Sequence, residues 1–147
     1  MAPRYLISAC LCGCRCRYDG GGYDEFPLLR ELAESGEAVA FCPEAAGGLP
    51  IPRTPCEIVG ERVISRTGVD CTAAYRSGAA QALAMCRSLG ITAAILKEKS
   101  PSCGSTHVAD GTFSGNKIPG MGLTAALLAE NGITVYSERA LPPELRG

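Results

Sequence analysis

The chain has 147 residues, nine cysteines and a formal net charge of −1, with basic and acidic residues in nearly equal number. This length is typical of one domain that buries a core without disulfides, and the balanced charge argues against a broad nucleic-acid-binding face. The sequence has no run of about 20 apolar residues for a membrane span, and its first apolar run is too short for a signal peptide. We therefore expect one cytoplasmic domain, residues 1–147, with no membrane partner.

The N-terminal part alternates between strand and helix patterns. Residues 4–9 are apolar and β-branched, which predicts a strand that leads into a Gly- and Cys-rich loop over 10–22. Asp24 can cap a following helix, whose apolar residues recur at helical spacing. A second short strand is predicted over 37–41, and it is followed by a long loop in which the prolines of 47–52 exclude regular structure.

The rest of the chain predicts a hairpin and then more alternation. The hairpin covers 57–64, and a polar loop over 97–117 is long enough to indicate a function. The other predicted elements are a helix over 72–89, a strand over 91–96, a helix over 122–130 and a strand over 133–136. This order predicts a single three-layer α/β domain that is Rossmann-like, with a mainly parallel four-stranded sheet and a small hairpin.

Three cysteines, Cys10, Cys42 and Cys103, each follow a predicted strand. Loops that leave the carboxyl ends of parallel strands meet in one crevice, so these thiols are expected to become neighbours there. The odd number of cysteines and the reducing environment of the cytosol make disulfides an unexpected use of them. Three thiolates can hold a metal centre and leave one coordination position open.

The run of alternate cysteines from Cys10 to Cys16 does not have the spacing of a zinc site, whose ligand pairs are separated by two to four residues. We interpret Cys12, Cys14 and Cys16 as small residues of a tight loop, one of which lines the pocket. We also interpret three other cysteines, Cys56, Cys71 and Cys86, as small buried residues. The single histidine, His107, excludes a histidine-rich zinc or copper site.

Two segments combine a thiol with polar companions. In 42–44, a proline between Cys42 and Glu44 gives a stiff turn that can direct both side chains to one place, although a buried thiol beside a solvated Glu fits equally. In 97–105, two lysines stand near Cys103, and nearby ammonium groups lower the pKa of a thiol. The alternative for this segment is an exposed charged loop.

Motifs along the whole chain resemble one protein family. They are residues 7–10 with 16–20, residues 42–44 with 47–50, residues 95–104, residues 110–113 and residues 119–128. In this order they resemble the bacterial thiouracil desulfidase family, which was long described only as a domain of unknown function. The string Lys-Glu-Lys-Ser-Pro-Ser-Cys-Gly within the third motif is highly specific.

The resemblance implies a [4Fe-4S] cluster held by Cys10, Cys42 and Cys103, with the fourth iron free to bind the sulfur of a substrate. It also implies a non-redox reaction on thiolated uracil, as free base or nucleoside. Water would attack the ring carbon, oxygen would replace the thiocarbonyl sulfur, and sulfide would be released.

The same resemblance suggests roles for polar residues. Glu44 would activate the water, Ser100 would relay a proton or orient the substrate, and Asp19 would position the base or tune the pocket. Lys97 and Ser102 would bind the substrate.

Two other functions stay open at this stage. One is removal of sulfur from thiolated tRNA, which the balanced charge does not favour. The other is a non-enzymatic zinc- or cluster-binding module that stores metal or senses redox state. A dehydrogenase is the least supported class, since a dinucleotide fingerprint is missing. The oligomeric state is not predicted.

Overall fold

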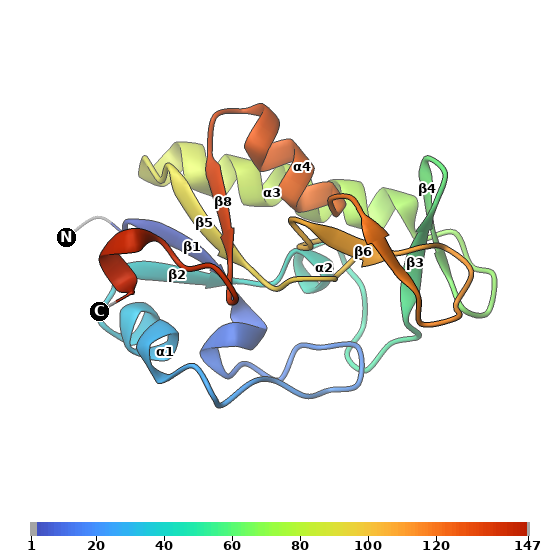
Figure 1. The fold of residues 1–147 in the computed structure, drawn as a ribbon, viewed down its shortest axis with the longest axis horizontal. Coiled ribbons are helices and arrows are strands. Elements are labelled where there is room, and N and C mark those ends of the chain that lie inside the picture. Colours follow the sequence, from blue (N-terminus) through green and yellow to red (C-terminus); the bar gives the residue numbers. More distant parts are fainter. Residues whose placement is uncertain (1–2, 147) are drawn as a thin grey trace.

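The computed structural model describes residues 3–146 and is built around a four-stranded parallel sheet (Figure 1). The strand order is β2-β1-β5-β8, and every neighbouring pair is parallel. The strands are β1 (Tyr5–Ser8), β2 (Ala38–Phe41), β5 (Ala93–Leu96) and β8 (Thr134–Ser137). The predicted parallel four-stranded α/β fold is therefore confirmed.

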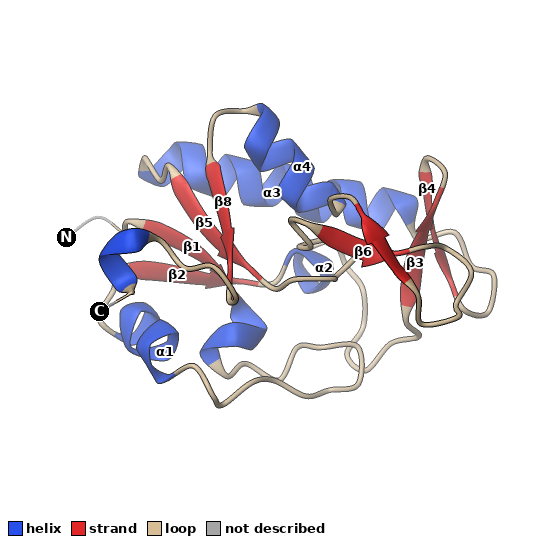
Figure 2. Ribbon diagram, in the orientation of Figure 1, coloured by secondary structure: helices blue, strands red, loops and turns tan. Residues whose placement is uncertain are grey.

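Helices cover both faces of this sheet (Figure 2). They are α1 (Pro27–Glu34) on one face, and α3 (Thr72–Leu89) and α4 (Leu123–Glu130) on the other. Side chains alternate across a strand, so Leu6 packs against α3 and α4 while Tyr5 and Ile7 pack toward α1. Burial on both faces explains why the two central strands, β1 and β5, are almost continuously apolar. Between residues 3 and 146, no helix has the length and apolar character that crossing a membrane requires.

Two antiparallel hairpins stand beside the sheet. The first pairs β3 (Cys56–Val59) with β4 (Arg62–Ser65), as predicted. The second pairs β6 (His107–Ala109) with β7 (Lys117–Pro119) inside the segment that was predicted to be a loop. Its strands have three residues each and no apolar alternation, so the sequence carries no pattern for them.

Several local predictions need correction. Asp24 does not cap α1, because its carboxylate binds Arg15 at 2.8 Å and Arg30 at 2.9 Å, and the helix begins with a proline at its first position. Short helical turns also occupy segments that were predicted to be loops. These are η1 (Ala9–Cys12) and α2 (Pro43–Ala46). A further turn, η2 (Pro143–Leu145), lies near the C-terminus, where no element was predicted.

Candidate active site

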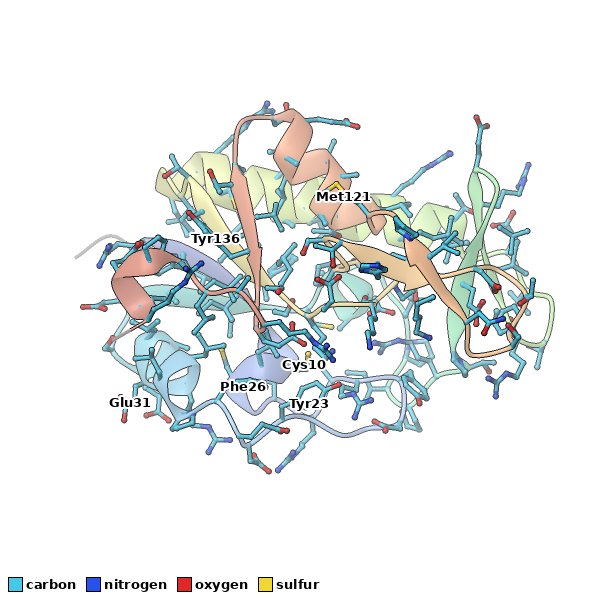
Figure 3. All side chains as sticks on the ribbon, in the orientation of Figure 1. Cys10, Tyr23, Phe26, Glu31, Met121 and Tyr136 are labelled. Atoms are coloured by element: carbon cyan, nitrogen blue, oxygen red, sulfur yellow. The ribbon has the colours of Figure 1, made fainter. Side chains whose placement is uncertain are left out.

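The cysteines that follow three adjacent strands line one cavity of about 410 Å³ at the carboxyl edge of the sheet. Cys10 lies in η1 directly after β1, and Cys42 comes immediately after β2. Cys103 lies in the loop after β5, on the other side of β1 in the sheet. Figure 3 shows Cys10 beside Tyr23, whose backbone N–H donates to the Cys10 carbonyl at 2.9 Å. The structure thus brings together the three thiols that the strand pattern singled out.

The thiol of Cys42 is the most acidic of the three. Hydrogen bonds with the Cys16 thiol and with the Ala45 amide outweigh burial and lower the pKa of Cys42 below its usual range. The same contact raises the pKa of Cys16. Because the thiolate is the metal-binding form, Cys42 is better suited than Cys16 to be a ligand at neutral pH.

Cys10 and Cys103 are protonated thiols in the cavity wall. Burial, with the nearby Cys42, raises the pKa of Cys10 to about 12, and burial also raises the pKa of Cys103. Metal binding deprotonates such thiols. Within residues 3–146, no three Cys, His, Asp or Glu side chains are grouped closely enough to hold a single metal ion.

The carboxylate of Glu44 lies beside Cys42 because α2 begins directly after that residue. The Tyr75 hydroxyl donates to Oε2 of Glu44, and Nε of Arg53 lies 3.5 Å from the same oxygen. The side chains of Arg53 and Glu44 are only 6% and 16% exposed. Among the described residues, no hydrogen bond or ion pair reaches the other oxygen, Oε1 of Glu44. This oxygen is free to bind a ligand of the cavity.

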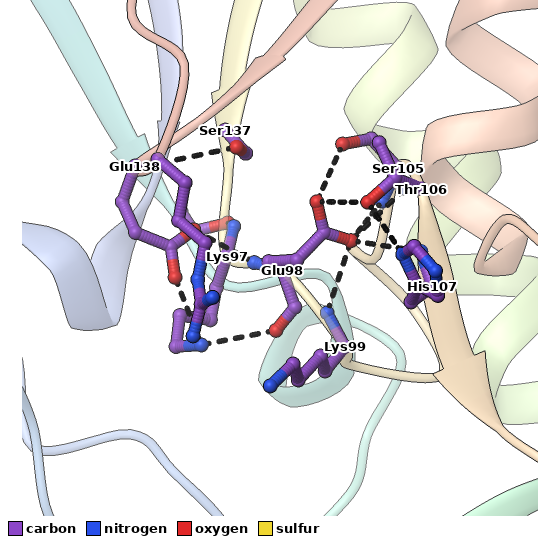
Figure 4. Close-up of polar contacts among 10 residues, drawn as sticks. Lys97, Glu98, Lys99, Ser105, Thr106, His107, Ser137 and Glu138 are labelled. Carbon is purple, nitrogen blue, oxygen red and sulfur yellow. Dashed lines mark hydrogen bonds and ion pairs between the residues drawn. The ribbon is translucent and has the colours of Figure 1, made fainter. Parts of the chain in front are cut away.

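The loop that carries Ser100 and Cys103 is organised by the buried carboxylate of Glu98 (Figure 4). Oε1 accepts backbone N–H bonds from four residues of the loop, Lys99, Ser105, Thr106 and His107. Burial alone would raise the pKa of Glu98, but these donors hold it at about 2. Glu98 therefore stays ionised, and its hydrogen bonds hold the two ends of the segment 99–107 together.

Ser100 and Lys97 both reach the cavity from this loop. Oγ of Ser100 accepts N–H bonds from Ser102 and Cys103, each at 3.1 Å, so its own proton remains available for donation. Nζ of Lys97 lies 2.9 Å from Oε2 of Glu138 and 5.4 Å from the centre of the Tyr23 ring. The ammonium is thus fixed between a carboxylate and an aromatic face.

Two residues that sequence reasoning assigned to the site do not line the cavity. Ser102 has no exposed surface, and its hydroxyl is bonded to Thr124 at 2.7 Å. Asp19 accepts the Gly21 N–H at 2.9 Å and pairs with Arg17 at 3.5 Å. Both side chains are committed to these contacts, so the geometry supports neither role.

The other cysteines of the N-terminal run separate. Cys16 lines the cavity beside Cys42, Cys14 is exposed, and the buried Cys12 donates to the Leu29 carbonyl at 3.6 Å. This arrangement agrees with the interpretation of the run as loop residues with one member in the pocket.

Sequence reasoning missed Tyr75, Arg53 and Glu138, which hold the polar residues of the site in place. For Tyr75, the sequence did carry a signal, which is a tyrosine on the buried face of an Ala-rich helix.

Basic residues outnumber acidic ones in the lining of the cavity, which favours an electron-rich ligand. The basic ones are Arg17, Arg53, Arg66, Lys97, Lys99 and Lys117, and the acidic ones are Glu44, Glu57 and Glu98.

The fold and the site define a Rossmann-like α/β protein with a thiol-lined cavity at the carboxyl edge of its sheet. The profile of the 2-thiouracil desulfurase family matches residues 5–140. The chain belongs to this family, which confirms the resemblance found in its motifs.

Two similar proteins extend this finding. An uncharacterized protein, YbbK of Bacillus subtilis (strain 168), is 43% identical over 146 residues, which cover 92% of this chain and 96% of the relative. The solved structure of the [4Fe-4S]-dependent thiouracil desulfidase TudS is similar with a TM-score of 0.92 and 48% identity. That comparison covers 97% of this chain and 95% of TudS.

Proposed function

We propose that this protein is a [4Fe-4S]-dependent desulfidase of thiolated uracil, as free base or nucleoside. Water supplies the oxygen that replaces the thiocarbonyl sulfur, hydrogen sulfide leaves, and no electrons are exchanged. The observation that carries the proposal is the convergence of three cysteines with Glu44 and Ser100 on one cavity. The likeness to a [4Fe-4S]-dependent thiouracil desulfidase supports it.

The residues of the cavity suit an iron–sulfur cluster. Such clusters take thiolate ligands, and we assign Cys10, Cys42 and Cys103 to this role. The low pKa of Cys42 supports its assignment. When bound through three cysteines, the cluster supplies one iron that acts as a Lewis acid toward the thiocarbonyl sulfur.

Glu44 acts on the water. Tyr75 and Arg53 both face Oε2, so Oε1 is the atom that accepts the proton of the attacking water. Ser100 donates its free hydroxyl proton toward the departing sulfur or the ring nitrogen, since its oxygen already accepts two amide bonds. Glu44 lies on α2 and Ser100 on the loop after β5, so the two groups reach the cavity from different segments of the chain.

Lys97 binds the substrate through its ammonium group, which lines the cavity with the Tyr23 ring beside it. Apolar side chains of the same lining, including Phe41 and Val108, limit access of other water molecules.

We also propose a cytoplasmic location, because all nine cysteines are free thiols.

Anaerobic purification tests this function. We expect iron and acid-labile sulfide in the protein, and release of sulfide and uracil from thiouracil without added reductant. Zinc without labile sulfide would contradict the proposal and favour a metal-binding module. A dependence on reductant would contradict the non-redox step, and faster turnover of thiolated tRNA than of thiouracil would contradict the small-molecule substrate.

A further inference from the structure

Glu138 lies at the carboxyl end of β8, the one strand of the sheet whose end has no role in the proposed reaction. β8 runs parallel to β5, and the last pair in register is Leu96 with Ser137. Lys97 and Glu138 each follow this pair by one residue, so the register places an ammonium beside a carboxylate. The Glu138 side chain is only 7% exposed.

Both oxygens of Glu138 are used (Figure 4). Oε1 accepts the backbone N–H of Glu98 at 2.8 Å, and Oε2 lies 2.9 Å from Nζ of Lys97. A carboxylate this deeply buried requires such partners, because an unpaired buried charge is costly. Glu138 therefore joins the backbone at the start of the loop after β5 to the ammonium of Lys97, a residue that lines the cavity.

The contact with Glu138 occupies one of the N–H donors of the Lys97 ammonium. An ammonium has three N–H donors. One is directed to Oε2 of Glu138, and a second donates to the Glu98 carbonyl at 3.0 Å. One N–H remains, and its direction is set by the other two. Glu138 itself does not line the cavity, whereas Lys97 does.

We infer that Glu138 is a positioning residue, which holds Lys97 so that its third N–H meets the bound pyrimidine. This inference rests on the proposed function and adds a residue to it. Lys97 shares the Tyr23 ring with another cation, Arg17, whose guanidinium carbon lies 4.7 Å from the ring centre. If the Glu138 carboxylate is removed, the repulsion between Arg17 and Lys97 is no longer offset, and the Lys97 ammonium moves away from its position.

The Glu138→Gln variant separates the two contacts of this side chain. Its amide oxygen can still accept the Glu98 N–H, whereas its NH₂ group cannot accept from Lys97. We expect the KM for thiouracil to rise about tenfold with kcat changed by less than about twofold, and a tenfold change corresponds to about 1.4 kcal/mol. Iron content is expected to stay at the wild-type value. Glu138→Asp keeps the charge and is expected to raise KM less.

The control variants distinguish positioning from a general loss of structure. Glu130→Gln removes the same charge from the exposed end of α4 and is expected to leave KM unchanged. In a Lys97→Met background, Glu138→Gln is expected to add nothing to KM, because a contact that acts through Lys97 is lost with it. An unchanged KM in the single variant, or an equal increase in both backgrounds, would overturn the inference.

Binding of uracil, the product of the proposed reaction, gives a readout without turnover. Equilibrium dialysis against the cluster-bearing protein is expected to show weaker uracil binding for Glu138→Gln than for the wild type. If the wild type binds uracil and releases sulfide from thiouracil while Glu138→Gln binds equally well, only the positioning inference fails. If the wild type does neither, the proposed function fails, and the inference fails with it.

Discussion

The Tyr75 hydroxyl donates a hydrogen bond to Oε2 of Glu44, across 31 positions of the sequence. This contact joins α3 to α2, and Arg53 approaches the same oxygen from the loop after α2. The carboxylate is therefore held through one oxygen, while the other is left to the cavity. The orientation of the proposed base thus depends on a helix that carries no motif of its own.

Tyr75→Phe is expected to lower kcat for thiouracil by about 10- to 100-fold, because a hydrogen bond to a charged group is worth roughly 1.5–3 kcal/mol. Without the hydroxyl, Glu44 can rotate and present either oxygen to water. Steady-state kinetics with iron quantification measures the effect, and iron content should not change. Tyr136→Phe, on β8 outside the cavity lining, is the matched control and should keep the wild-type kcat. A wild-type kcat in Tyr75→Phe would contradict the role of this contact.

Gly78→Ala is expected to displace α2, on which Cys42 and Glu44 depend. A Cβ at residue 78 would lie 2.0 Å from the Pro43 carbonyl oxygen, which is backbone and cannot turn aside. Overpacking of this kind costs about 1–3 kcal/mol. We expect a lower melting temperature together with reduced iron content, whereas Ser77→Ala on the exposed face of α3 should change neither. Normal iron content in Gly78→Ala would show that α2 tolerates the shift.

Serine variants of the three cysteines test the ligand assignment. Cys10→Ser, Cys42→Ser and Cys103→Ser should each lose most of the iron, since a serine hydroxyl replaces a thiolate ligand poorly. Cys14→Ser should keep the wild-type iron content, because this side chain is exposed and outside the cavity lining. Iron and labile sulfide per chain, measured without oxygen, decide the matter. Equal iron in all four variants would rule out the three-ligand assignment.

Periodicity was sufficient to predict the framework of this protein. The apolar runs gave the strands of the sheet, and the predicted helix over 72–89 coincides with α3. The meeting of Cys10, Cys42 and Cys103 followed from topology, because the three strands before them are parallel neighbours. The strands and helices follow from hydrophobic periodicity, and the meeting of the cysteines follows from the rule that loops after parallel strands lie at one edge of the sheet. Periodicity and strand order can both be inferred from one sequence.

Side-chain directions inside loops could not be predicted in the same way. Ser102 stands beside Cys103 in a specific motif, yet it turns into the core toward Thr124. Its partner Thr124 lies on α4, 22 positions further along the chain, so this direction depends on a tertiary contact. The same limit explains why Tyr75 was missed, since its partner Glu44 is close only in the folded chain.

The stability of the loop after β5 should depend on pH through Glu98. The pKa of this carboxyl falls from its ordinary value of 4.5 to about 2 in the folded protein. A lowered pKa stabilises the fold above the unfolded pKa, and this contribution is lost as the pH falls toward 2. At pH 7 the shift corresponds to roughly 3 kcal/mol in the free energy of unfolding.

Glu98→Gln should therefore be less stable than the wild type at pH 7, and the difference should shrink between pH 4.5 and pH 2. Urea unfolding followed by circular dichroism at several pH values measures this difference in the free energy of unfolding. Iron-free protein is used so that release of iron at low pH does not contribute. Glu130→Gln serves as the control, because its exposed carboxylate at the end of α4 should give a small difference at every pH. A difference between Glu98→Gln and the wild type that stays constant with pH would mean that the carboxylate charge does not hold the loop.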